Sequence, residues 1–374
     1  MNDRDLASDA RELLEKIASA PRFAGSDSEA NVRQLCASLL KSHGFSVRED
    51  PFTFSEFPAR YGPTVLGLLL IAAVLLASHM YTDHGGAGPA IGTLLLGLLL
   101  TGVAGRWLGG GAVLTLPLLR SSSANLIATR GTPTVWLVAH ADSKSQTIPM
   151  LVRVAAVVLT FVAVAVLGFT LIFGWVSGMA NGEAIIGCEV VPILAIVASA
   201  GAIPLVFCLT GNKSPGAVDN ASGLVSVLLA VRELAAHADV GVIVTSAEEL
   251  ALAGARAHVE SNHARATVVN CDTIDDHGGF LCMIHSRNRG PAAAAVVRAG
   301  ERLAMPVRVR ALIPGILTDS VAFADAGWDA VTVSRGNLGT LARVHTSSDT
   351  RERMDGSGIA NVARLLAATI EELR

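Results

Sequence analysis

Residues 134–142 read TVWLVAHAD, and this short stretch decides the fold class. An apolar run of strand length ends there in a histidine and an aspartate. The same pattern recurs at 241–249, GVIVTSAEE, and at 266–272, ATVVNCD. Between the last two lies a helix-length segment, and 223–236 carries apolar residues at helical spacing. Strands that alternate with helices predict an α/β fold with a mostly parallel central sheet flanked by helices.

The remaining polar segments extend this pattern in both directions. Further strands are expected at 125–129 and 330–334, an extended segment at 47–54, two helices within 4–47, and helices over 249–260 and 357–373. In parallel sheets, functional sites form beyond the carboxyl ends of the strands. The side chains that follow the predicted strands, His140, Glu248-Glu249 and Asp272, are therefore expected to lie close together.

The chain is unusually apolar, with 51% hydrophobic and only 16% charged residues among its 374. The excess lies in four segments, at 63–81, 89–105, 152–174 and 190–210. A helix that crosses a bilayer needs about 20 apolar residues. Buried core helices of a soluble enzyme are the alternative, but these are usually shorter or amphipathic. The composition predicts four transmembrane helices arranged as two hairpins, of which the second helix is the shortest and contains glycine.

This organisation divides the chain into a discontinuous catalytic domain and two inserted hairpins. The catalytic domain comprises 1–61, 119–149 and 211–374, and the hairpins comprise 62–118 and 150–210. The connectors within the hairpins, 82–88 and 175–189, contain no Lys or Arg, whereas the other segment ends are flanked by basic residues. The positive-inside rule then predicts a multi-pass protein of the cell membrane, with the catalytic domain and both termini in the cytoplasm. The first apolar segment begins too late for a secretory signal peptide.

Charge and cysteine content narrow the expected partners. The net charge of −3 does not favour binding to nucleic acid. Five scattered cysteines without paired spacing indicate reduced thiols rather than a disulfide framework. The expected partners are therefore a lipid bilayer and a small substrate.

The first candidate site residues are His140, Asp142 and Asp219. In H-x-D, the histidine can bind a metal ion while the aspartate orients its ring, although a solvated aspartate beside a strand-end histidine is a common alternative. Asp219, in the segment AVDNASG, precedes a predicted helix and could simply cap it. A carboxylate has two oxygens, however, and can also bridge two metal ions.

The second group of candidates comprises Glu248, Glu249, Asp272 and His345. Neighbouring glutamates at a strand-to-helix junction point in different directions, so one can bind metal while the other accepts a proton. The alternative is the ordinary enrichment of acidic residues in the first turn of a helix. Asp272 either places a charge at the end of a buried strand or belongs to a turn, and His345 alone would be an ordinary surface histidine. Histidines without such a context rank below it: His258, His263, His277 and His285, with His79 and His84 at the far membrane edge.

In this order and context, the motifs resemble those of the zinc aminopeptidases of metallopeptidase family twenty-eight, the aminopeptidase Y and bacterial leucyl aminopeptidase type. The resemblance rests on VAHADS, AVDNASG, SAEELALAGARAHVE, VVNCDTI and TDSVAFADAGWDAVTVS followed by VHTSSDT. The N-terminal segments IASAPRFAGSDSEANVRQL and HGFSVREDPF are also similar. The resemblance covers essentially all of the chain outside the apolar segments.

The resemblance implies two Zn²⁺ ions, which Co²⁺ or Mn²⁺ could replace, and a role for each candidate residue. Asp219 would bridge the ions, with His140 and Asp272 completing the ligands of one ion and Glu249 and His345 those of the other. Glu248 would be the general base, and Asp142 would orient His140. Some family members stabilise the oxyanion with a tyrosine, but this chain has only Tyr61 and Tyr81, both beside the first apolar segment, so the oxyanion donor is unidentified.

Four functions make different demands on these residues. The leading hypothesis is a membrane-anchored aminopeptidase or dipeptidase that acts on short peptides. The second is an amidohydrolase that cleaves a lipidated or acylated amino acid at the membrane interface. A peptidase-like receptor without activity should have lost ligand residues, and a transporter should carry charged residues inside its helices.

Overall fold

The strand-rich segments and the apolar segments fold into two separate structural units. The computed structural model describes residues 3–83, 86–181, 189–235, 238–262, 264–285, 290–312 and 316–374. The first unit comprises 1–56, 114–145 and 212–374, and the second comprises 57–113 and 146–211. Three groups of residues singled out by the sequence lie outside the described residues: His84, His263 and residues 182–188 of the connector 175–189, which include Cys188.

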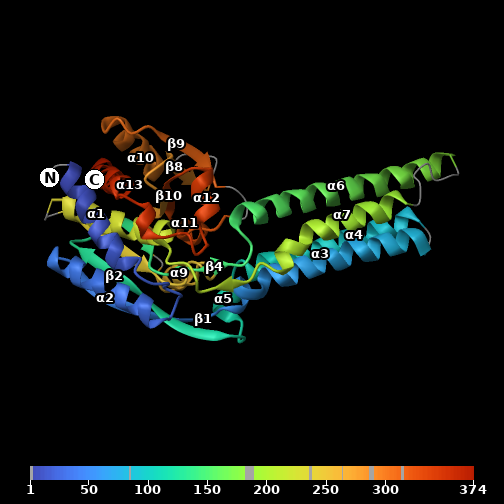
Figure 1. The fold of residues 1–374 in the computed structure, drawn as a ribbon, viewed down its shortest axis with the longest axis horizontal. Coiled ribbons are helices and arrows are strands. Elements are labelled where there is room, and N and C mark those ends of the chain that lie inside the picture. The colour runs from blue at the N-terminus through green and yellow to red at the C-terminus, as the bar shows by residue number, and fades with distance from the viewer. Residues whose placement is uncertain are drawn as a thin grey trace. The chain divides into compact units, whose positions relative to one another are not determined.

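An eight-stranded sheet forms the centre of the first unit (Figure 1). The strand order is β1-β2-β6-β3-β7-β10-β8-β9. The strands are β1 (Ser46–Ser55), β2 (Arg120–Arg130), β3 (Val135–His140), β6 (Val240–Thr245), β7 (Thr267–Ile274), β8 (Gly279–Ile284), β9 (Val307–Ala311) and β10 (Asp329–Gly336). A separate two-stranded ribbon pairs β4 (Ser145–Gln146) with β5 (Thr210–Gly211).

Four of the seven strand pairs are parallel, so the sheet is mostly parallel as expected, but three antiparallel pairs make it a mixed sheet. Its central strands β6, β3, β7 and β10 are parallel neighbours, and β8 is parallel to β9. The pairs β1–β2, β2–β6 and β10–β8 are antiparallel. Apolar patterning shows which residues are buried but not in which direction a strand runs, so the sequence could not separate these cases.

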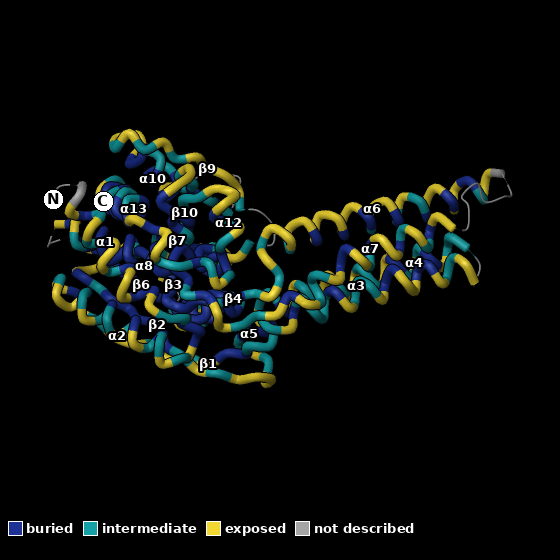
Figure 2. The backbone as a smooth tube through the Cα atoms, viewed as in Figure 1, coloured by how far each residue is buried: buried dark blue, intermediate teal, exposed yellow. Residues whose placement is uncertain are grey.

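Helices cover the sheet on both faces. On one face, α9 (Ala253–Ser261) and α11 (Asp319–Asp325) pack against apolar side chains of the sheet strands, such as Val138, Ile243 and Val268. The other helices of this unit are α1 (Asp3–Ile17), α2 (Asp27–Ser42), α8 (Ser222–Glu233), α10 (Pro291–Arg302), α12 (Leu338–Arg343) and α13 (Ser357–Leu373). Of these, α8 packs against β3 and β7, and α13 packs on α8. Figure 2 shows that the central strands are buried along their length.

Two helix starts differ from the expectation. The helix expected from residue 249 begins only at Ala253, so Glu248 and Glu249 lie in a loop rather than in a first helical turn. Asp219 does not cap α8 directly but lies in an irregular turn, Ala217–Ala221, that precedes it. In both places hydrogen bonds from other segments fix the backbone outside the helix.

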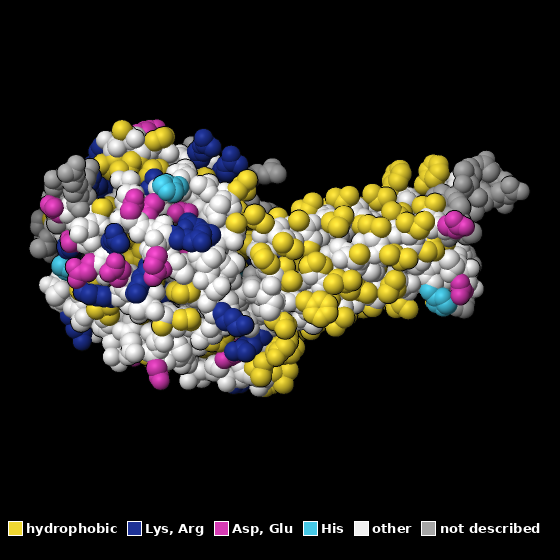
Figure 3. Space-filling model, viewed as in Figure 1, with side chains coloured by type: hydrophobic (Ala, Val, Ile, Leu, Met, Phe, Trp, Pro, Cys, Tyr) yellow, Lys and Arg dark blue, Asp and Glu magenta, His cyan; other side chains and the backbone are white. Residues whose placement is uncertain are grey.

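The second unit consists of four apolar helices: α3 (Phe57–Asp83), α4 (Ala87–Leu108), α6 (Met150–Asn181) and α7 (Val190–Val206). They pack through a common core that includes Val74, Leu94, Leu167, Leu171 and Val191. Large apolar side chains remain exposed along these helices, and Figure 3 shows them covering the visible face of this unit.

By length and composition, α3, α4 and α6 could each cross a membrane, so three of the four expected spans meet that test. The helix expected to be marginal, α4, has 22 residues and meets it. The fourth, expected over 190–210, ends at Val206 after 17 residues and is a shorter apolar helix.

Candidate metal centre

The strand-end residues of the first unit converge in two adjoining groups. His140, Glu248 and Asp272 form one group, and Asp219, Glu249 and His345 form the other. Within each group, one potential ligand atom of every residue lies within 4.8 Å of the others, and all six residues are buried. His140 ends β3, Asp272 lies near the end of β7, and the two glutamates follow β6. Because these strands are parallel neighbours, their carboxyl ends meet at one edge of the sheet.

Asp219 joins the two groups through its two carboxylate oxygens. Oδ1 lies 3.3 Å from Nε2 of His140, and Oδ2 lies 3.1 Å from Nε2 of His345. Nε2 of His140 also lies 3.9 Å from both Glu248 Oε2 and Asp272 Oδ1, whereas Nε2 of His345 lies 3.2 Å from Glu249 Oε2. One carboxylate thus faces an imidazole on each side.

Asp142 positions the loop that carries the two glutamates. Its Oδ1 accepts a hydrogen bond from the backbone N–H of Glu248, and its Oδ2 accepts one from that of Glu249, both at 3.2 Å. Nδ1 of His140 lies 3.1 Å from the carbonyl oxygen of Asp142 and 3.5 Å from its Oδ1. An acceptor on Nδ1 leaves Nε2 directed at the carboxylates, which is the usual arrangement of a metal-binding histidine.

The turn that carries Asp219 is held by two further buried side chains. Asp349 accepts hydrogen bonds from the backbone N–H groups of Val218 and Asp219, at 2.8 and 3.1 Å. Asn220 donates to the carbonyl of Cys271 and accepts from the N–H of Thr273, which ties this turn to β7 beside Asp272. These contacts fix Asp219 relative to the strand that carries another candidate ligand.

Left-handed backbone conformations concentrate around the site. Ala247, Ala251 and Leu252 flank the glutamates with φ between 56° and 63°, Thr273 follows Asp272 with φ 59°, and His345 itself has φ 63°. Residues other than glycine avoid this region unless surrounding contacts enforce it. Such a cluster is typical of a functional site, where side-chain direction takes precedence over backbone preference.

The two neighbouring glutamates differ in the direction in which their surroundings shift their pKa. Burial and the nearby carboxylates of Asp272 and Glu249 raise the pKa of Glu248 well above its ordinary value, although His140 opposes this. Burial also acts to raise the pKa of Glu249, but His345 and Lys144 outweigh it and lower that pKa. Burial tends to lower the pKa of His140, yet Glu248, Asp142 and Asp219 raise it well above 6.5. One glutamate thus favours holding a proton while its neighbour favours the charged form.

The residues present fit a pair of divalent cations. His140 Nε2 and Glu249 Oε1 are buried and have no hydrogen-bond partner within the described ranges. A buried polar atom without a partner is costly, and His140 Nε2 lies within 3.9 Å of carboxylate oxygens of Asp219, Glu248 and Asp272. The donors are imidazole nitrogens and carboxylate oxygens, a set that suits Zn²⁺, with Co²⁺ and Mn²⁺ as alternatives.

The sequence patterns missed several residues that support the centre. Lys144 Nζ lies 2.6 Å from Glu249 Oε2. Asp319 is fully buried, accepts a hydrogen bond from Thr245 Oγ1, and has its pKa raised to about 7 by burial. Asp349 and Arg22 are also buried beside the site. All four residues lie in or near the motifs quoted above. The sequence alone, however, does not show whether a charged side chain in such a motif is buried or solvated.

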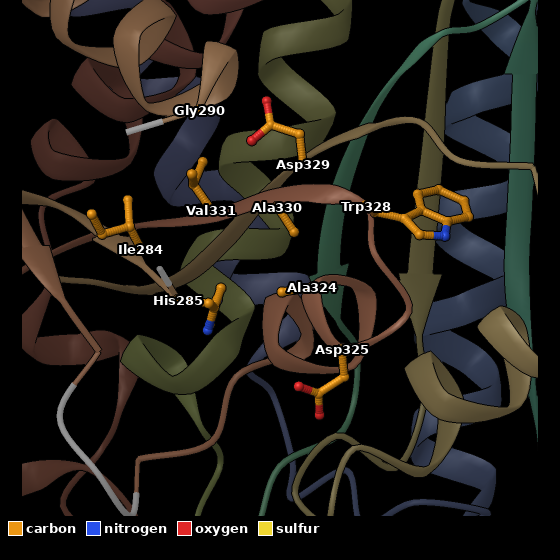
Figure 4. A pocket seen from close by; sticks show the side chains of 9 residues that line it. All are labelled: Ile284, His285, Gly290, Ala324, Asp325, Trp328, Asp329, Ala330 and Val331. Atoms are coloured by element: carbon orange, nitrogen blue, oxygen red, sulfur yellow. The ribbon is translucent and has the colours of Figure 1, made fainter. Parts of the chain in front are cut away.

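The lower-ranked histidines that the structure describes, His79, His258, His277 and His285, lie outside both groups. His258 is buried among Trp136, Phe323 and Trp328. His285 lines a cavity of about 370 Å³ together with Asp325 and Asp329. None of the residues that line this cavity belongs to the metal-binding groups, and Figure 4 shows the two aspartates pointing away from each other. The cavity therefore does not assemble a second set of convergent ligands.

Comparisons with known proteins agree with this geometry. The profile of peptidase family M28 matches residues 202–370, a range that contains Asp219, both glutamates, Asp272 and His345. The chain therefore belongs to the metallopeptidases, a class of hydrolases. Within that class, its residues 202–370 match peptidase family M28.

The solved structures that resemble the chain show the fold. An aminopeptidase from Aneurinibacillus sp. strain AM-1 is 15% identical with a TM-score of 0.59, over 99% of this chain and 95% of that chain. The zinc aminopeptidase BSAP from Bacillus subtilis is 16% identical with a TM-score of 0.58, over 98% and 94%. A glutaminyl cyclase from Fimbriiglobus ruber is 14% identical with a TM-score of 0.55, over 99% and 95%. Among curated proteins, no sequence matches the chain.

Proposed function

We propose that the chain is a di-zinc aminopeptidase or dipeptidase anchored in a membrane by its apolar helices. The observation that carries the proposal is the position of Asp219, whose two oxygens lie 3.3 and 3.1 Å from His140 and His345. A carboxylate that faces one imidazole on each side is suited to bridge two ions. The family supports hydrolysis of a peptide bond, and the solved aminopeptidases share the fold.

Each residue of the centre then has a defined role. His140 and Asp272 would hold one ion, Glu249 and His345 would hold the other, and Asp219 would be shared. Asp142 would orient His140 and, through its backbone hydrogen bonds, keep both glutamates in place. When bound, the two ions would supply a polarised carbonyl and a water of lowered pKa.

Glu248 would move the proton. It lies in the same buried group as His140 and Asp272, and its raised pKa suits a group that alternates between proton acceptor and donor. It would accept a proton from the attacking water and then donate that proton to the departing amine. The Glu248 carboxylate is therefore assigned to catalysis rather than to permanent metal binding.

The second unit would anchor the enzyme in a lipid bilayer. Three of its helices have the length and composition of membrane spans, and their large apolar side chains are exposed. The distribution of Lys and Arg along the chain favours a cytoplasmic site and cytoplasmic termini. Protease added to right-side-out vesicles should then leave the C-terminal region intact, and removal of that region would contradict the orientation.

The central test measures metal and hydrolysis on the same samples of the full chain purified in detergent. The wild type should contain about two zinc ions per chain and cleave amino-terminal residues from an unbiased peptide library. Glu248→Gln should retain the metal but lose turnover by about 100- to 10,000-fold. The exposed Glu260→Gln is the matched control and should behave like the wild type. Full activity of Glu248→Gln would refute the assigned mechanism.

An amide substrate with an acyl chain is the alternative that the apolar unit motivates. Matched substrates with and without an acyl chain, assayed in the same vesicles, distinguish the two. Equal turnover would favour soluble peptides, and a strong preference for the acylated form would favour a lipidated substrate.

A further inference from the structure

Arg22 is the largest side chain that is fully buried in the first unit, and its guanidinium contacts backbone carbonyls rather than a carboxylate. It is 1% exposed. Its Nε donates to the carbonyl of Ala141 at 2.8 Å, and its Nη2 donates to that of Gly216 at 3.1 Å. Its Nη1 donates to the carbonyls of Ile17, at 3.2 Å, and Pro215. Four carbonyls from three separate parts of the chain are thus satisfied by one planar side chain.

The carbonyl acceptors lie directly beside the candidate ligands. Ala141 separates His140 from Asp142, and Gly216 precedes Asp219 by three residues in the sequence. The turn at Gly216 is tight, with φ +60°, and an added Cβ would lie 2.4 Å from the carbonyl oxygen of Asp219 and 2.5 Å from Cβ of Ser143. Small changes in the position of either turn would therefore move a metal-binding side chain.

Backbone hydrogen bonds strengthen the same junction. The N–H of Arg22 donates to Ser143 Oγ and the N–H of Ser143 donates to the carbonyl of Arg22, both at 2.9 Å. Ser143 Oγ in turn donates to the carbonyl of Ser214 at 3.0 Å. The three pieces of the first unit, 1–56, 114–145 and 212–374, meet at this point.

The charge of Arg22 complements the acidic site. Burial lowers the pKa of its guanidinium to about 10, while Asp142, Asp349 and Asp219 act in the opposite direction. The side chain is therefore charged at neutral pH, and its charge lies near three carboxylates that would otherwise repel one another. Lysine could supply the charge but not the planar fork that reaches several carbonyls at once.

We propose that Arg22 is a positioning residue of the metal centre, which sets the separation between the turn of His140 and the turn of Asp219. This inference rests on the proposed metal-dependent function. The two turns are more than 70 residues apart in the sequence, with the second pair of apolar helices between them. Covalent continuity therefore does little to fix their spacing, and a contact from the N-terminal segment fixes it instead.

The test compares Arg22→Lys and Arg22→Ala with the wild type, using the full chain in detergent. Bound metal is first removed from the protein with a chelator. Binding of Co²⁺ to the metal-free protein is then measured by the visible absorption of the bound ion. The affinity of Arg22→Lys for Co²⁺ should fall by about 10- to 100-fold, as is typical when a contact that supports metal ligands is lost. Its far-ultraviolet circular dichroism spectrum should match that of the wild type. The exposed Arg11→Lys is the control and should bind as the wild type does.

Chemical rescue separates positioning from general stability. In Arg22→Ala, added guanidinium at millimolar concentration should restore Co²⁺ binding, because it can refill the space among the carbonyls, whereas methylammonium should not. Wild-type affinity in Arg22→Lys would overturn the proposal, even if Arg22→Ala fails to fold. If the wild-type protein binds two ions but cleaves no peptide, the proposed peptidase function is refuted, whereas the positioning role of Arg22 is not. A wild type that binds no divalent ion would refute both.

Discussion

Lys144 Nζ lies 2.6 Å from Oε2 of Glu249, and both side chains are largely buried. The group formed by Asp219, Glu249 and His345 therefore has an ammonium in contact with one of its carboxylates. Lys144 follows the H-x-D motif by two residues, so a single short segment contributes His140 to one group and this cation to the other. The two groups of potential ligands are therefore electrostatically unequal.

Replacing Lys144 with methionine should tighten binding at the position of Glu249. Burial acts to raise the pKa of Glu249, while His345 and Lys144 lower it, so removal of the ammonium makes this carboxylate more basic. It also removes a repulsion between like charges, and together these changes should increase the affinity for the ion at the position of Glu249 by about 10-fold. Calorimetric titration with Zn²⁺ measures both affinities. The exposed Lys213→Met is the control, and weaker binding in Lys144→Met would contradict the prediction.

Asp219→Asn should remove metal from both positions rather than one. The amide cannot offer a negatively charged oxygen to each side, where Asp219 now faces His140 and His345. The zinc content should fall from about two ions per chain to well below one, measured by elemental analysis after gel filtration. The exposed Asp5→Asn should keep its metal. Retention of one full ion by Asp219→Asn would show that the carboxylate is not shared.

Asp142→Asn should impair both stability and turnover. The Asp142 carboxylate accepts hydrogen bonds from the N–H groups of Glu248 and Glu249, one on each oxygen. An amide can accept only one of them and would present its own N–H₂ to the other, which leaves a buried donor unpaired at a cost of about 1–3 kcal/mol. Urea unfolding and peptidase assays measure the two effects. Asp27→Asn, on the exposed start of α2, is the control, and unchanged stability in Asp142→Asn would be inconsistent with this role.

Burial of neutral His258 should make the folded protein less stable in mild acid. Burial lowers its pKa to about 4 in the folded protein, whereas the ordinary value is 6.5. Below pH 6.5 the unfolded chain binds a proton that folded His258 does not, so stability falls as the pH decreases from 6.5 towards 4. The contribution at pH 5 is about 2 kcal/mol, since one pKa unit corresponds to about 1.4 kcal/mol.

The variant His258→Phe should remove this component while keeping an aromatic ring beside Trp136, Phe323 and Trp328. The free energy of unfolding is measured at pH 7 and at pH 5 for the variant and for the wild type. Comparing the two pH-dependent drops cancels the contribution of the carboxylates that both proteins share. The drop should be smaller in the variant. An equal drop would show that His258 is not buried in its neutral form.

Gly97 of α4 is predicted to be essential for packing within the helical unit. A Cβ at this position would lie 2.2 Å from Cβ of Ala73 in α3, so the two helices approach too closely for any other residue. Gly97→Leu should lower the thermal stability of the unit in detergent. Gly102→Leu, in the same helix, is the control because nothing lies within 4 Å of an added Cβ there. Equal stability of the two variants would contradict the observed packing.

Local patterns in the sequence are enough to select the candidate residues of the metal centre, because a strand that ends in a charged or metal-binding side chain can be recognised from its own residues. His140, Asp219, Glu248-Glu249, Asp272 and His345 were selected in this way together with the family resemblance, and the structure brings all of them together. The apolar helices follow from the sequence as well, because the apolar segments are long and contain few charged residues. Peptidase family M28 is visible in the same motifs.

The strand directions are set only when the chain folds, as are the two-sided position of Asp219 and the contacts of the supporting residues Arg22, Lys144, Asp319 and Asp349. Each of these depends on contacts between segments that are far apart in the chain, and a local pattern carries no information about such partners. A buried charge looks the same in a sequence as a solvated one. The physical reason is that burial and hydrogen bonding, which set the role of a charged side chain, are properties of its surroundings rather than of the residue.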